Sequence, residues 1–124
     1  MNVALATGSV RDGQGRIFVS LLQFRRFVSD AKIAKRYFVS GMVQGVGFRY
    51  FAQDAAEKLH VSGFVRNLRD GRVEVYVMGT PEQHAEFQAM LQRGPRFSSV
   101  SEVREEPATP DPQYEGGFVI NPSA

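Results

Sequence analysis

Residues 43–49 read Val43-Gln44-Gly45-Val46-Gly47-Phe48-Arg49, and this glycine-rich stretch decides how the fold begins. The residues just before it, 35–41, contain the aromatic and β-branched run Tyr37-Phe38-Val39, which predicts a strand. Apolar residues at helical spacing then form the expected buried stripe of a helix: Phe48, Phe51, Ala52, Ala55, Ala56 and Leu59. The glycine-rich stretch is therefore a loop that leaves a strand and enters a helix.

This loop has the residue types that a phosphate site needs. Its amide N–H groups precede a helix, where they lack intrahelical acceptors and face the positive end of the helix dipole. Gly45 and Gly47 tolerate the backbone angles that turn successive N–H groups toward an anion. Arg49 can bind two phosphate oxygens at once. The predicted phosphate-binding residues are Gln44, Gly45, Val46, Gly47, Phe48 and Arg49. The alternative is a tight turn in which Arg49 is only solvated.

Two further strands are predicted after the first helix, at Val61–Leu68 and Arg72–Met78. His60 falls in the last turn of that helix, and Gly63 lies just beyond its expected end. Asp70-Gly71 between the two strands is a strong hairpin signal. The pattern therefore predicts an antiparallel pair of strands directly after the helix.

A second helix is predicted to begin at a capping box. Thr80 can accept a hydrogen bond from the first turn, Pro81 suits the first helical position, and Gln83 can return the bond. Its expected buried stripe consists of Phe87, Met90 and Leu91. Gly94-Pro95 is expected to end the helix.

The remaining residues predict two more strands. Phe97–Val103 is the fourth, and a connection with Pro107, Pro110 and Pro112 leads to a short last strand around 118–120, expected at a sheet edge. The order β-α-β-β-α-β plus an edge strand predicts the α+β class. The expected fold is a ferredoxin-like sandwich with an antiparallel or mixed sheet and two helices on one face.

The composition narrows the chemistry. A chain of 124 residues suits one compact domain. The absence of cysteine excludes disulfides, thiolate nucleophiles and cysteine-based zinc sites. The two histidines, His60 and His84, are interpreted as structural or solvent-exposed. Residues 35–124 contain ten basic and eleven acidic side chains, so a broad nucleic-acid-binding face is not expected on the core.

Residues 1–34 differ from the rest, with five basic and two acidic side chains. Their apolar run, 17–24, is far shorter than the roughly 20 residues of a membrane span. Its flanking charges do not fit a signal peptide. A basic amphipathic helix through Ile17, Leu21, Phe24 and Val28 is one interpretation, and a transit peptide is a weaker one. We expect a poorly ordered extension over 1–34, or a start site assigned too far upstream, and a functional domain over 35–124.

Two long segments stand at a characteristic separation. The first, 37–49, is Tyr37-Phe38-Val39-Ser40-Gly41-Met42-Val43-Gln44-Gly45-Val46-Gly47-Phe48-Arg49. The second, 63–75, is Gly63-Phe64-Val65-Arg66-Asn67-Leu68-Arg69-Asp70-Gly71-Arg72-Val73-Glu74-Val75. They resemble the two signatures of the acylphosphatase family. The resemblance extends from about Lys35 to Ile120 and departs from the usual pattern at Met42, often basic in the family, and at Phe64, often tryptophan.

The resemblance implies an enzyme that hydrolyses small acyl phosphates without a metal or organic cofactor. It also implies that Arg49 binds the phosphate and that Asn67 positions the attacking water. An asparagine before a turn often bonds only its own backbone. An amide has no proton to lose near neutral pH, so Asn67 can orient water but cannot act as a base. Asp54 and Asp70 are interpreted as a solvated helix residue and a turn residue, which leaves a phosphate oxygen as the expected proton acceptor.

Two other functions fit parts of the pattern. One is a non-catalytic domain that binds acyl or carbamoyl phosphate. The other is an RNA-recognition module, which has the same element order but needs its glycine-aromatic string on the third strand. Here that string precedes the first helix. We expect a cytoplasmic monomer that binds a small-molecule acyl phosphate and neither nucleic acid nor membrane.

Overall fold

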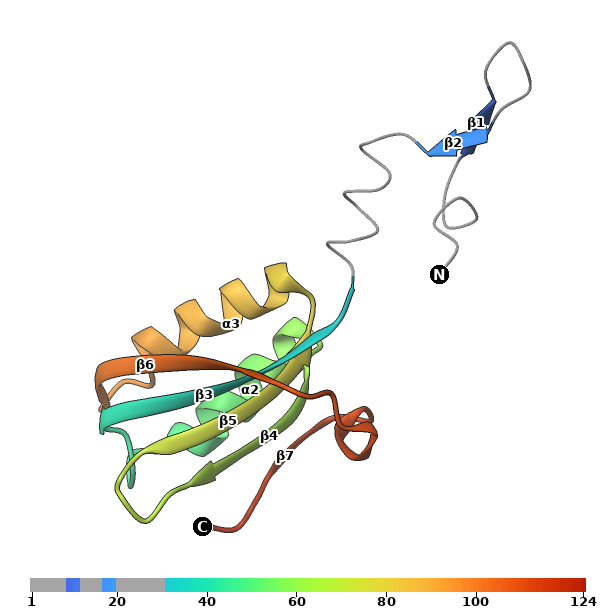
Figure 1. Ribbon diagram of the computed structural model, residues 1–124. Coiled ribbons are helices and arrows are strands. Elements are labelled where there is room, and N and C mark those ends of the chain that lie inside the picture. Colours follow the sequence, from blue (N-terminus) through green and yellow to red (C-terminus); the bar gives the residue numbers. More distant parts are fainter. Residues whose placement is uncertain (1–8, 12–16, 20–30) are drawn as a thin grey trace. The chain divides into compact units, whose positions relative to one another are not determined.

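The computed structural model describes residues 9–11, 17–19 and 31–124 (Figure 1). The chain divides into two units, Met1–Ala31 and Lys32–Ala124. In the first unit, strand β1 (Ser9–Arg11) pairs antiparallel with β2 (Ile17–Val19). The prediction of an amphipathic helix is therefore wrong at Ile17–Val19, where β-branched and aromatic residues favour a strand. The rest of that expected helix, residues 20–30, lies outside the described residues.

The second unit contains a five-stranded sheet with the order β6-β3-β5-β4-β7. Its strands are β3 (Ile33–Met42), β4 (Ser62–Asn67), β5 (Val73–Gly79), β6 (Ser99–Ala108) and β7 (Phe118–Ile120). All neighbours pair antiparallel except β4 and β7, which are parallel. The sheet is therefore mixed, and the short last strand lies at an edge, as the sequence predicts.

Two helices cover one face of this sheet, α2 (Phe48–Leu59) and α3 (Pro81–Arg93) (Figure 1). A short 3-10 helix, η2 (Pro112–Tyr114), lies between β6 and β7. The order of strands and helices in this unit confirms the predicted ferredoxin-like sandwich. Neither described helix has the length and apolar character needed to cross a membrane.

The core lies between the sheet and the helices. Side chains alternate between the two faces of a strand, so Tyr37 and Val39 of β3 point toward the helices and are fully buried. Phe48 and Ala52 of α2, and Phe87 of α3, meet them from the other side. Phe48 thus anchors the first turn of α2 in the core, directly after the glycine loop.

Two element boundaries differ from the sequence prediction. Helix α2 ends at Leu59, and its C-cap His60 adopts the left-handed conformation (φ 58°), whereas Gly63 lies inside β4. Strand β6 begins at Ser99, two residues later than predicted, and continues through Pro107 to Ala108. Proline has no backbone N–H to donate. Because β6 is an edge strand, no further strand needs that donor, and Pro107 can lie opposite Lys35 of β3.

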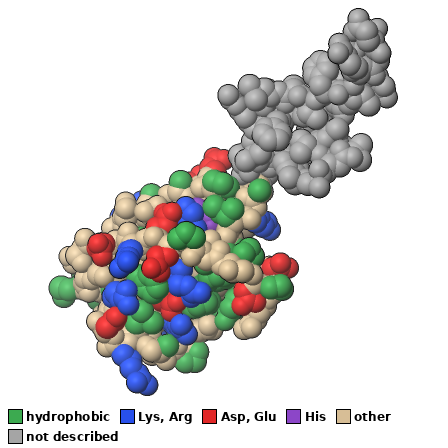
Figure 2. All heavy atoms as spheres, viewed as in Figure 1, with side chains coloured by type: hydrophobic (Ala, Val, Ile, Leu, Met, Phe, Trp, Pro, Cys, Tyr) green, Lys and Arg blue, Asp and Glu red, His purple; other side chains and the backbone are tan. Residues whose placement is uncertain are grey.

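The face of the sheet away from α2 and α3 is partly covered by η2, whose Tyr114 packs against Phe64 and Tyr76. Charged side chains of both signs are interspersed on the rest of this face (Figure 2). The Glu74 carboxylate is buried here between two arginines. It accepts hydrogen bonds from Nη1 of Arg36 and, at 2.6 Å, from Nε of Arg66. The charge of Arg66 is therefore paired with that of Glu74, its cross-strand partner in the β4–β5 hairpin.

A buried polar pair joins α3 to β3. The Tyr37 hydroxyl lies 2.7 Å from Nδ1 of His84, and Nε2 of His84 lies 2.9 Å from the carbonyl oxygen of Ile33. A carbonyl oxygen only accepts, so Nε2 must donate to it. Neutral His84 therefore has Nδ1 free to accept the tyrosine proton. Both side chains are buried, and His84 is structural, as expected from the sequence.

We expect the free energy of unfolding to fall as the pH falls below about 6.5, the ordinary pKa of histidine. Burial lowers the pKa of His84, and the Lys35 ammonium lowers it further. The hydrogen bond to Ile33 and the charge of Glu105 raise this pKa, but the net shift is downward. The folded state therefore holds fewer protons than the unfolded state, and this stability is lost as the pH passes down through the lowered pKa. One proton contributes at most about 1.4 kcal/mol per pH unit.

Urea unfolding of the wild type between pH 5 and 8 measures this slope. A His84→Phe variant should be less stable at pH 8 by about 1–3 kcal/mol, because the Tyr37 hydroxyl loses its acceptor. The pH slope below 6.5 should be smaller in this variant. An unchanged slope in the variant would show that other groups cause it.

Candidate active site

The glycine loop between β3 and α2 adopts a left-handed backbone conformation at two positions. Gly45 has φ 75° and Gly47 has φ 78°, both in the left-handed region that side chains disfavour. A Cβ atom at either position would meet no other atom within 4 Å. The need for glycine here is therefore conformational rather than steric.

The N-terminus of α2 is left open. Its first intrahelical hydrogen bond runs from the N–H of Phe51 to the Gly47 carbonyl oxygen, at 3.0 Å. No side chain caps the helix, and no acidic residue lies in its first turn. The amides of the first turn and the positive end of the helix dipole are therefore available to an anion.

Helix α3 begins in the opposite way, which shows that an uncapped start is not general in this fold. The Thr80 hydroxyl accepts from the N–H of Gln83 at 3.1 Å, and the Gln83 side chain accepts from the N–H of Thr80 at 2.8 Å. Glu82 lies in the first turn of α3. The predicted capping box is confirmed. It provides a side-chain acceptor for a first-turn N–H group of α3, whereas the first turn of α2 has no such acceptor.

Arg49 and Asn67 line the same small hollow at the open end of α2. This loop hollow has a volume of about 120 Å³. Its lining residues are Val43, Gly45, Gly47, Phe48, Arg49, Tyr50 and Asn67. Among the described residues, no carboxylate lies within ion-pair distance of Arg49. A half-buried guanidinium thus faces the hollow beside the uncapped amides, which is an arrangement suited to an anion.

Asn67 is the last residue of β4 and is held from two sides. It pairs with Val73 of β5, and its carbonyl oxygen accepts a hydrogen bond of 2.9 Å from the N–H of Ala124. Strand alternation puts its side chain on the same face as Val65, the face covered by the helices. The backbone of Asn67 is therefore fixed, and its amide is directed toward the end of α2 that bears Arg49.

The structure separates the predicted phosphate residues into two groups. Gly45, Gly47, Phe48 and Arg49 line the loop hollow, whereas Gln44 and Val46 do not. Val43 and Tyr50 also line it and were not predicted from the sequence. Tyr50 could have been recognised, because it follows Arg49 in the first turn and is not part of the buried stripe. Val43 gives no such signal, since it resembles any buried strand residue.

Neither aspartate near the site is positioned as a free base. Asp70 accepts from the backbone N–H of Arg72 at 3.0 Å and from its Nε at 2.9 Å. The backbone bond to Arg72 is the main cause that lowers the pKa of Asp70. Asp54 pairs with Lys58 one turn further along α2, at 3.0 Å. These contacts agree with the sequence interpretation of a turn residue and a helix-surface residue.

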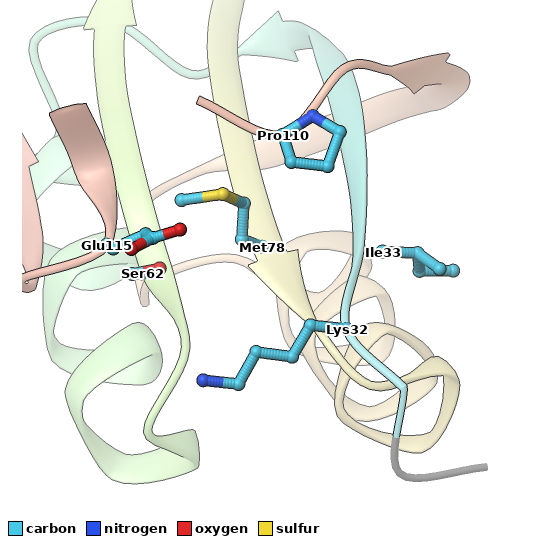
Figure 3. Close-up of a pocket in the computed structure, with 6 residues that line it drawn as sticks. All are labelled: Lys32, Ile33, Ser62, Met78, Pro110 and Glu115. Carbon is cyan, nitrogen blue, oxygen red and sulfur yellow. The ribbon is translucent and has the colours of Figure 1, made fainter. Parts of the chain in front are cut away.

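A larger hollow of about 450 Å³, the distal hollow, lies at the other ends of β4 and β5 (Figure 3). Its lining residues are Lys32, Ile33, Ser62, Met78, Pro110 and Glu115. They come from the starts of β3 and β4, the end of β5 and the segment between β6 and β7. Its two charged side chains, Lys32 and Glu115, have opposite signs, and the first residues of α2 and α3 are not among its lining residues. Size alone favours the distal hollow, but the chemistry of the lining favours the loop hollow.

Within the described part of the chain, no group of three or more His, Asp or Glu side chains is placed to hold a metal ion. The chemistry available at the loop hollow comes from a guanidinium, backbone amides, one carboxamide and the phenol of Tyr50. Such groups bind and orient an anion and a water molecule, but they do not accept a proton near neutral pH.

The fold is a ferredoxin-like sandwich in which an arginine and an asparagine line a hollow at an uncapped helix start. The family model described as acylphosphatase matches residues 35–120. The chain belongs to the acylphosphatase family.

Similar proteins agree with this assignment. The chain is 53% identical over 75 residues to the acylphosphatase of Solibacter usitatus, covering 60% of this chain and 78% of that protein. The crystal structure of acylphosphatase from Bacillus subtilis matches with a TM-score of 0.67 and 35% identity, over 72% of this chain and 98% of that one. Full-length HypF, solved in its phosphate- and nucleotide-bound form, matches with a TM-score of 0.68 and 26% identity, over 76% of this chain but 12% of that chain.

Proposed function

We propose that this protein hydrolyses the carboxyl–phosphate bond of small acyl phosphates, giving a carboxylate and inorganic phosphate. The main support is that Arg49, the glycine-loop amides and Asn67 line one hollow. The family membership supports the same reaction. The substrate is a small molecule, and the phosphate group is the part that all acyl phosphates share.

The phosphate group binds to Arg49 and to the N–H groups of the loop and first helical turn. Arg49 donates two parallel hydrogen bonds, and the uncapped amides of α2 donate the others. Charge-assisted bonds of this kind contribute about 1.5–3 kcal/mol each. These groups also stabilise the charge that spreads over the phosphoryl oxygens in the transition state.

The Asn67 carboxamide holds the attacking water in line with the bond that breaks. The water oxygen forms a bond to phosphorus while the bond from phosphorus to the acyl oxygen breaks. The water proton passes to an oxygen of the bound phosphate, because Asn67 has no basic site near neutral pH. The leaving group is a carboxylate and needs no acid. Positioning and charge stabilisation then account for most of the acceleration.

A non-catalytic phosphate-binding domain is the main alternative, and HypF shows that this fold also occurs as a small part of a larger chain. Release of inorganic phosphate from acetyl phosphate and benzoyl phosphate decides between the two. An enzyme releases phosphate in proportion to time and protein concentration. A binding domain would show saturable binding without release, and that result would overturn the proposal.

Removal of divalent metals should leave the activity unchanged. The groups proposed to bind and orient the reactants are a guanidinium and amides, which need no metal to act. The measurement is phosphate release after dialysis against EDTA, compared with the same protein after added Mg²⁺ or Zn²⁺. Loss of activity on dialysis, with recovery on adding either ion, would show that a metal site belongs to the reaction.

We propose further that the protein acts as a cytoplasmic monomer and does not bind nucleic acid. Arg49, Asn67 and the loop amides, which are the groups proposed to act on the substrate, line a single hollow of this chain. The sequence has no cysteine and thus no dependence on the disulfides of oxidising compartments. On the face of the sheet away from α2 and α3, Glu74 pairs with both Arg36 and Arg66 and offsets one of their two positive charges, which reduces the charge available to a nucleic-acid backbone.

A further inference from the structure

The Gln44 side chain leaves the glycine loop and binds a different part of the chain. Its amide nitrogen Nε2 donates to the carbonyl oxygen of Leu68 at 2.7 Å and to that of Arg72 at 2.8 Å. Leu68 and Arg72 flank the turn that joins β4 to β5. The sequence predicts that the backbone amide of Gln44 belongs to the phosphate-binding loop, whereas both side-chain bonds of Gln44 go to the hairpin.

A primary amide suits this position because one nitrogen provides two donors. Each carbonyl that it binds also belongs to the hairpin. The Arg72 oxygen accepts from the N–H of Leu68 at 2.8 Å, and the Leu68 oxygen accepts from the N–H of Gly71 at 3.1 Å. Gln44 therefore ties the base of the hairpin to the loop at two points, one on each side of the turn.

This connection lies between the two groups proposed to act on the substrate. Gln44 begins the loop that leads to Arg49, and Leu68 directly follows Asn67. The other restraints on the Asn67 backbone, from Val73 and Ala124, belong to the sheet and the C-terminal segment and do not reach the loop. The Gln44 bonds join the phosphate cradle directly to the strand end that presents the water-binding amide.

We infer that Gln44 is a positioning residue, whose two hydrogen bonds to the hairpin set the distance between the bound phosphate and the water held by Asn67. The inference rests on the proposed function. In-line attack needs the reacting atoms about 3–3.5 Å apart, and a misplacement of about 1 Å costs about a hundredfold in rate. Loss of these bonds should therefore lower the rate of the chemical step and leave phosphate binding intact.

The test is a Gln44→Met variant, which keeps the side-chain length and removes both donors without adding charge. The matched control is Gln53→Met, because Nε2 of Gln53 also donates to a carbonyl oxygen, that of Phe118 at 3.3 Å, away from the loop hollow. The measurements are kcat and KM with benzoyl phosphate and inhibition by inorganic phosphate. Thermal unfolding and amide hydrogen exchange at Leu68 and Gly71 are measured on the same three proteins.

For Gln44→Met we expect kcat to fall about 10- to 100-fold with the inhibition constant of phosphate within about twofold of wild type. Exchange at Leu68 and Gly71 should become faster, and the midpoint of unfolding should fall by only a few degrees. Gln53→Met should show the same small change in unfolding midpoint with an unchanged kcat.

An unchanged kcat in Gln44→Met would overturn the inference. So would a parallel loss of phosphate affinity, which would make Gln44 a direct phosphate ligand. If the wild type releases no phosphate, the proposed function fails. Amide hydrogen exchange still tests, without any turnover, whether the Gln44 bonds hold the hairpin. Unchanged exchange at Leu68 and Gly71 in Gln44→Met would show that the connection does not hold the hairpin.

Discussion

Replacing Arg49 by alanine should abolish both phosphate binding and hydrolysis. Arg49 is the cationic side chain among the described residues that line the loop hollow, and no described carboxylate pairs with it. Loss of two charge-assisted hydrogen bonds, each of about 1.5–3 kcal/mol, corresponds to about a hundredfold to ten-thousandfold weaker binding of the phosphate group. Because the same bonds stabilise the transition state, kcat/KM should fall by at least this factor.

The measurements for Arg49→Ala are phosphate release from benzoyl phosphate and inhibition by inorganic phosphate. Arg93→Ala is a matched control, since Arg93 is an exposed arginine in the last turn of α3. It should keep wild-type kinetics. Arg49→Lys should recover little activity, because an ammonium cannot form the two parallel bonds of a guanidinium. Wild-type activity in Arg49→Ala, with circular dichroism showing a folded protein, would exclude Arg49 from the site.

Replacing Asn67 by alanine should separate binding from turnover. The Asn67 side chain is proposed to contact water and not the phosphate, so inhibition by phosphate should stay within about twofold of wild type. Loss of one positioned hydrogen-bonding group should lower kcat by about a hundredfold to a thousandfold. The folded structure should persist, because the backbone bonds of Asn67 to Val73 and Ala124 do not involve its side chain.

Steady-state kinetics with a panel of acyl phosphates measures this separation. Asn121→Ala is the matched control. Asn121 follows β7, and its backbone N–H bonds to the carbonyl oxygen of Val65 at 2.9 Å whatever its side chain. The control should keep the wild-type kcat. If Asn67→Ala lost phosphate affinity and kcat together, Asn67 would be a phosphate ligand. If it kept full activity, another group would have to position the water.

Elements with local signals were predicted well. The capping box of α3 depends on groups three residues apart, and Thr80 and Gln83 form it as expected. The strand–loop–helix passage through 43–49 was also recognised, since glycines and helical periodicity act over a few residues. The end of α2 was predicted less well. His60 adopts the left-handed conformation that glycine usually supplies, so composition alone pointed to Gly63.

Features that depend on neighbours distant in sequence were missed. Pro107 was assigned to a connection because proline usually ends a strand, but β6 lies at the sheet edge and includes it. Arg36 of β3 binds the Glu74 carboxylate although the two residues lie 38 positions apart in the sequence, and the sequence analysis did not anticipate this pair. In both cases the strand order and register decide the environment, and local periodicity does not specify them.

For the functional site, the sequence by itself determined the chemical groups: a glycine loop at a helix start, an arginine in the first helical turn and an asparagine before a hairpin. These are properties of short segments, whose conformation follows from backbone preferences and local hydrogen bonds. Only the tertiary structure brought Arg49 and Asn67 to one hollow and committed the Gln44 side chain to the hairpin. Both β3 and β4 pair with β5, and this pairing brings the loop after β3 close to the end of β4, although the two are far apart in the sequence.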